Sequence, residues 1–162
     1  MKKIEVVIET PKESGQKYDY DPETKFFKLK KILPSGMVFP FDFGFIPHTK
    51  GDDGDPLDII VISDSCSFPG CMMECRLIGG FKAMQTDSTN KKKIIRNDRF
   101  IGIPSQSVLY QKIKSIEDLP DKILQELEDF FINYNKIQNK KFKILSKLNP
   151  ASAIKIIKKA SS

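Results

Sequence analysis

The chain has 162 residues, of which 40% are hydrophobic and 30% charged, and a formal net charge of +6. This composition excludes an intrinsically disordered chain, and the absence of an apolar run of about 20 residues excludes a helical membrane protein. We expect one domain over residues 1–162, with a core that buries roughly two thirds of the surface of the unfolded chain. The excess of positive charge predicts an attraction for anions.

Cysteine and histidine are scarce. Three cysteines lie close together at Cys66, Cys71 and Cys75, in an odd number and without the paired spacing of a zinc site. We therefore predict free thiols and a cytoplasmic location, with no membrane partner. His48 is the only histidine, so acid-base chemistry is left to carboxylates, lysine and tyrosine.

The first two thirds of the chain have the pattern of short strands. Runs of β-branched and aromatic residues, separated by Gly, Pro, Asp and Ser, predict strands at 4–10, 17–21, 26–32, 37–45, 58–63, 72–84 and 100–104. Short strands at this spacing favour a small barrel.

The last third changes to a helical period. From Pro120, apolar side chains recur at steps of three and four residues as far as Ile137, which predicts one amphipathic helix. A second helix is predicted to open at Asn149-Pro150, with lysines on its outer face.

An acidic segment is the main candidate for a functional site. Residues 52–58 hold four carboxylates, and Gly54 and Pro56 favour a turn there. Crowded carboxylates repel one another unless a cation lies between them, and Mg²⁺ prefers such oxygen ligands. An ordinary acidic turn is the plainer interpretation, and the flanking sequence decides between the two.

The flanking sequence resembles one enzyme family. The aromatic run at residues 37–47, followed by Asp53-Gly-Asp-Pro-Leu-Asp58, is similar to the signature of the soluble, magnesium-dependent inorganic pyrophosphatases of family I. The resemblance extends over residues 17–19, 68–70, 116–120 and 130–134. It implies an α+β, β-rich fold: a five-stranded barrel of the oligonucleotide-binding type, with additional N-terminal strands and two flanking C-terminal helices. It also implies hydrolysis of pyrophosphate to two phosphates with several Mg²⁺ ions.

The resemblance also implies roles for single residues. Asp55 corresponds to the carboxylate that takes a proton from the nucleophilic water, and Asp53 and Asp58 correspond to metal ligands. Glu9 and Asp19 correspond to supporting carboxylates of the same site. The groups expected to hold the phosphates are Lys17, Lys31, Arg99 and Tyr134.

Several positions depart from the family pattern, so we expect a divergent member. Phe39 and Phe43 stand where tyrosines are usual, and Asn135 stands where a lysine is usual, with Lys136, Lys140 and Lys141 as candidate substitutes.

The family has two aspartates in the region 86–99, where this chain offers three candidate metal ligands: Asp87, Asn97 and Asp98. Strict register selects Asn97. Asp98, one residue later, points to the other face of a strand unless the backbone bulges.

Two alternatives remain. The same fold and metals would also suit another phosphoanhydride, such as a nucleotide or a short polyphosphate. A barrel of this type can instead bind nucleic acid, but an acidic site repels a phosphate backbone, so we expect no nucleic-acid partner. By resemblance we expect a homo-oligomer, a hexamer.

Overall fold

Five strands close into a barrel in the computed structural model, which describes residues 2–161. They are β1 (Lys3–Thr10), β4 (Asp42–Ile46), β5 (Leu57–Val61), β8 (Arg99–Pro104) and β6 (Met72–Thr86). In this order each strand pairs with the next, and β6 pairs with β1 to complete the ring. The pairs are antiparallel except β5–β8, which is parallel. The predicted five-stranded barrel is confirmed.

The strands of the barrel contribute to two apolar cores. On β5, Ile59 and Val61 pack with Val6, Ile8 and Phe100, whereas Ile60 joins a second cluster with Ile101 and Phe131. Successive side chains of a strand point to opposite faces, so one apolar run supplies both cores.

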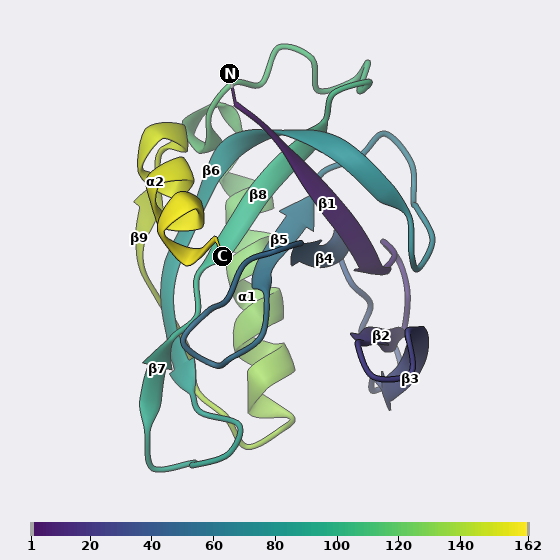
Figure 1. The fold of residues 1–162 in the computed structure, drawn as a ribbon, viewed down its shortest axis with the longest axis vertical. Helices are drawn as coiled ribbons and strands as arrows, with labels where there is room; N and C mark the ends of the chain where they lie inside the picture. The colour runs from purple at the N-terminus through teal and green to yellow at the C-terminus, as the bar shows by residue number, and fades with distance from the viewer. Residues whose placement is uncertain (1, 162) are drawn as a thin grey trace.

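One helix belongs to each core, as Figure 1 shows. Helix α1 (Asp121–Lys136) contributes Leu124, Leu127, Phe130 and Phe131 to one cluster, and α2 (Pro150–Ala160) contributes Ala153 and Ile157 to the other. Both helices were predicted. The Asn149 side chain accepts a hydrogen bond from the Ser152 N–H (2.8 Å) and caps α2. A short 3₁₀ helix, η1 (Ile116–Asp118), precedes α1.

Four strands lie outside the ring. The hairpin of β2 (Gln16–Asp21) and β3 (Phe26–Ile32) stands apart at the lower right of Figure 1. Strands β7 (Ile94–Arg96) and β9 (Phe142–Leu148) pair with β6, which is long enough to continue beyond the barrel. Neither β7 nor β9 was predicted, because β7 has only three residues and β9 is interrupted by lysines; both pair with β6.

The predicted strand at 37–45 is partly wrong, since only Asp42–Ile46 forms a strand. Residues 37–40 form a loop in which the Met37 N–H bonds to the Pro34 carbonyl (3.0 Å) and the Phe39 N–H bonds to the Ser14 carbonyl (3.1 Å). Pro40 has no N–H to give to a sheet. The loop turns Phe39 into the core beneath the cavity described below.

Gly44 permits the close contact between β4 and β1. A Cβ atom at this position would lie 2.0 Å from the Val7 carbonyl oxygen, so no larger residue fits without moving a strand. None of the helices within residues 2–161 is long and apolar enough to cross a membrane.

Candidate active site

A cavity of about 650 Å³ lies where the barrel, the β2–β3 hairpin and the C-terminal end of α1 meet. Most of the residues predicted for a site line it: Glu9, Lys17, Asp19, Lys31, Asp53, Asp55, Asp58, Asn97, Arg99 and Tyr134. They come from segments far apart in the sequence. The barrel therefore assembles a single polar cavity from them.

The loop before β5 and the start of β5 supply three of the carboxylates. Its turn is closed by a hydrogen bond from the Gly51 N–H to the Asp55 carbonyl (2.8 Å), and Gly54 adopts a positive φ of 88°. The Asp55 N–H donates to Asp53 Oδ1 (3.0 Å), which fixes the orientation of Asp53. Asp53, Asp55 and Asp58 line the cavity, and Asp55 is exposed and thus accessible to water. We call these three residues the acid wall.

Burial and mutual repulsion act on the acid wall. Burial is the main cause that raises the pKa of Asp53 and of Asp58; the charges of neighbouring carboxylates add to both shifts, and Arg99 opposes them. A cation bound beside these carboxylates would favour their charged forms. The acid wall therefore favours a cation.

A buried lysine joins the neighbouring acids. Lys17 is 7% exposed, forms an ion pair with Asp19, and has its Nζ 3.7 Å from Glu9 Oε2. Burial raises the pKa of Glu9 to about 7, and the charge of Lys17 only partly offsets this shift. Glu9 also accepts a hydrogen bond from the Tyr20 N–H (2.9 Å), which ties β1 to the hairpin.

Beside the acid wall, an arginine is held by several partners. Arg99 Nη1 lies 2.7 Å from Asp58 Oδ2 and 2.6 Å from Asn97 Oδ1, and Nη2 lies 3.0 Å from Gln85 Oε1. Its guanidinium carbon lies 5.1 Å and 5.4 Å from the ring centres of Phe131 and Phe142. The side chain is thus fixed at the junction of barrel and helix.

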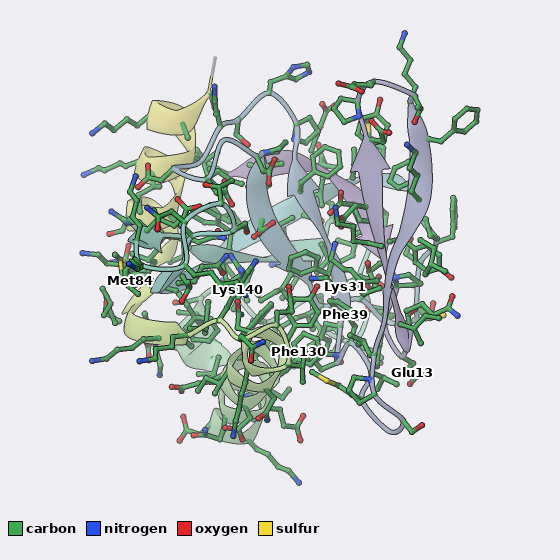
Figure 2. All side chains as sticks on the ribbon, turned by 90° about the horizontal axis from the view of Figure 1, so that it is seen from below. Glu13, Lys31, Phe39, Met84, Phe130 and Lys140 are labelled. Carbon is green, nitrogen blue, oxygen red and sulfur yellow. The ribbon has the colours of Figure 1, made fainter. Side chains whose placement is uncertain are left out.

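Two further lysines face the cavity without an acidic partner among the described residues. Lys31 donates to Gln138 Oε1, with its Nζ 5.3 Å from the centre of the Tyr134 ring, and Lys140 Nζ donates to Ser88 Oγ (2.9 Å). Burial, followed by the charge of Lys140, lowers the pKa of Lys31 to about 8. Figure 2 labels both lysines, and Phe39 and Phe130, which pack against Tyr134, lie near Lys31. This part of the cavity favours an anion.

Asp87 and Asp98, two of the predicted metal ligands, do not line the cavity. Asp87 accepts hydrogen bonds from the Thr89 N–H (2.7 Å) and hydroxyl (2.8 Å) and orders its own loop. Asp98 is buried, pairs with Arg96 (2.8 Å) and accepts from the Ala83 N–H (3.1 Å). Residues 97–98 lie between β7 and β8, and these contacts hold Asp98 away from the cavity that Asn97 lines.

Three of the cavity residues that sequence reasoning missed, Gln85, Ser88 and Gln138, bond to its cations. Gln85 and Gln138 bond to Arg99 and Lys31, and Ser88 bonds to Lys140. An isolated glutamine carries no signal in the sequence. The pairing of β6 with β7 and β9, which places Gln85, was not predicted either.

The structure also shows where the residues that depart from the family pattern lie. Phe43 lines the cavity with Lys17 Nζ 5.1 Å from its ring centre, whereas Phe39 packs against Phe130 and Tyr134. Asn135 is buried, and its side-chain amide donates to the Phe131 carbonyl (2.8 Å). Of the three candidate lysines, only Lys140 lines the cavity, while Lys136 and Lys141 are exposed.

The fold and cavity are those of a small β-barrel enzyme with acids and cations facing one another. The family model described as inorganic pyrophosphatase matches residues 6–162. The chain belongs to the inorganic pyrophosphatase family.

Individual relatives agree over nearly the whole chain. It is 36% identical to the inorganic pyrophosphatase of Geobacillus stearothermophilus over 95% of this chain and 89% of the relative. It is 37% identical to that of Synechocystis over 88% and 80% of the two chains. The crystal structure of the Thermus thermophilus inorganic pyrophosphatase superposes with a TM-score of 0.89 at 30% identity, over 98% of this chain and 88% of that one.

The raised pKa of Glu9 predicts a pH dependence of stability. A carboxyl group whose pKa rises on folding stabilises the folded state while it is protonated, and this contribution is lost as the pH rises from about 4.5 to about 7. The full shift corresponds to at most about 3 kcal/mol. We therefore expect the free energy of unfolding, measured with urea in the absence of metal, to fall less between pH 5 and pH 8 for Glu9→Gln than for the parent. Equal losses in the two proteins would contradict the assignment.

Proposed function

We propose that this chain hydrolyses inorganic pyrophosphate to two phosphates with Mg²⁺, and that it does so in the cavity described above. The observation that carries the proposal is the convergence of Asp53, Asp55 and Asp58 with Arg99, Lys31 and Lys17 around one cavity. Pyrophosphate with bound divalent ions presents both signs of charge. A cavity lined by both carboxylates and cations therefore suits it.

The acid wall fits Mg²⁺ by its chemistry. Its ligands are carboxylate oxygens, and a bound cation would favour the charged forms of Asp53 and Asp58, whose pKa values are raised mainly by burial. Among residues 2–161, no group of three or more His, Cys, Asp or Glu side chains is by itself arranged to hold a metal ion. Mg²⁺ usually retains water and is held by one or two carboxylates together with substrate phosphates, so the substrate would complete the coordination.

The carboxylates and the cations of the cavity then have distinct tasks. Asp53 and Asp58 would hold Mg²⁺, which on binding supplies Lewis acidity to the phosphoryl oxygens and lowers the pKa of the attacking water. Asp55, exposed at the tip of the turn, accepts the proton from that water. Arg99, Lys17, Lys31 and Tyr134 bind the phosphoryl oxygens and stabilise the charge on the departing phosphate.

The activity is proposed for the cytoplasm, since Cys66, Cys71 and Cys75 are all free thiols, as expected in a reducing compartment. A homo-oligomer, by resemblance a hexamer, is proposed as well. Large apolar side chains at the surface, such as Phe26, Ile32 and Leu109, support contacts between copies.

Phosphate release from pyrophosphate tests the function directly. We expect release with Mg²⁺ and none with EDTA, because the charge of the anhydride remains unshielded without metal. Tripolyphosphate and ATP, assayed in parallel, should be hydrolysed more slowly. Preferential hydrolysis of either one would instead identify another phosphoanhydride as the substrate.

Replacement of the base tests the mechanism. Asp55→Asn should lower kcat by about 10²–10⁴-fold, because the amide cannot accept the proton of the attacking water. Asp52→Asn is the matched control, since Asp52 lies in the same turn but does not line the cavity. An Asp55→Asn variant as active as this control would refute the role of Asp55.

Lys140 should bind substrate in place of the lysine that Asn135 replaces. Lys140→Ala should raise the KM for pyrophosphate by about tenfold, because a hydrogen bond to a charged partner contributes roughly 1.5–3 kcal/mol. Lys141→Ala, the same change at an exposed neighbour outside the cavity, should leave KM unchanged. Equal KM values for the two variants would exclude Lys140 from substrate binding.

A further inference from the structure

Beside the acid wall the cavity is lined by two amides, and two of the predicted carboxylates lie outside it. Gln85 on β6 and Asn97, just before β8, both face the cavity, whereas Asp87 and Asp98 turn away from it. We call Gln85, Asn97 and Arg99 the amide wall. A metal bound to the amide wall would have to use the amide oxygens, since the nitrogens of these amides are donors.

Both amide oxygens already have a cationic partner. Asn97 Oδ1 accepts from Arg99 Nη1 (2.6 Å), and Gln85 Oε1 accepts from Arg99 Nη2 (3.0 Å). The nitrogen of the same amide, Asn97 Nδ2, donates to Asp53 Oδ2 (3.2 Å). The amide orientation is determined by these partners, because the guanidinium can only donate and the carboxylate can only accept. Asn97 thus links the cation to the acid wall.

The Arg99 guanidinium is also fixed by burial, by aromatic rings and by an ion pair. It is 5% exposed, it lies against the rings of Phe131 and Phe142, and it pairs with Asp58 Oδ2 at 2.7 Å. Asp58 keeps its second oxygen, Oδ1, for a metal on the acid wall. A divalent ion on the amide wall would have to displace Arg99 from Asn97 Oδ1 and Gln85 Oε1, and it would gain only these two neutral ligands from the amides.

We propose that Arg99, held by Asn97 and Gln85, takes the place of one divalent cation, so that metal ions bind on the acid wall alone. This inference rests on the proposed function for its substrate. The permanent charge of Arg99 then serves the phosphoryl group in the place of a metal, with the fork geometry that suits two phosphate oxygens. The affinity of a site for a hard cation rises with the number of charged ligands, so a carboxylate on the amide wall should create a further metal site.

Metal counting tests this inference without substrate. Mn²⁺ binding is measured by electron paramagnetic resonance on the parent and on Asn97→Asp, with thermal melting to verify folding. Asn97→Asp should bind one ion more per chain than the parent. Asn90→Asp is the matched control: it makes the same change on the exposed β6–β7 loop outside the cavity, and it should bind as many ions as the parent. Equal counts for the parent and Asn97→Asp would overturn the proposal.

A second variant removes the positive charge of Arg99. Arg99→Gln keeps donors at the position but loses the charge, so Mn²⁺ should bind at least about tenfold more tightly near Asp58. Unchanged or weaker binding in this variant would also overturn the proposal. The titrations contain no pyrophosphate. A parent that fails to hydrolyse pyrophosphate but shows these metal counts would refute the proposed function and leave the inference standing.

Discussion

The ion pair between Asp58 and Arg99 is the contact on which the cavity depends. It follows from the only parallel pairing in the barrel, in which Ile59 on β5 lies opposite Phe100 on β8. Asp58 and Arg99, which precede these two residues, are therefore neighbours at the same end of the two strands. Ile59 and Phe100 are completely buried, so the position of the ion pair is determined by the packing of the core beneath it.

The position of Arg99 also connects the barrel to α1. Phe131 on α1 and Phe142 on β9 contact the guanidinium, and both rings belong to the apolar cluster between barrel and helix. Breaking a buried pair by removing one partner is costly because the other charge is left without compensation. The same contact thus orients a functional group and couples the cavity to the core.

The acids and cations of the cavity come mostly from different segments and meet in ion pairs such as Asp58–Arg99. The acid wall comes from one short turn and the start of β5; in the turn, Gly54 and the Gly51–Asp55 hydrogen bond bring carboxylates together. The cations come from β2, β3, β8 and the loop after α1, and they approach only after the hairpin and helix have packed. A cavity with both kinds of group supports a substrate that carries metal as well as free phosphoryl oxygens. The Asn97 amide connects Asp53 to Arg99.

Some features were determined by the sequence alone. Local periodicity predicted six of the seven proposed strands closely and both helices, because side-chain alternation and helical spacing are written in consecutive residues. The acidic turn was equally visible, since Asp, Gly and Pro favour a turn for local reasons. The tertiary structure decided the rest. It created β7 and β9 by pairing with β6, it turned Asn97 rather than Asp98 into the cavity, and it selected Lys140 over Lys136 and Lys141. These outcomes depend on register and on contacts between distant segments, which the sequence near each residue does not encode.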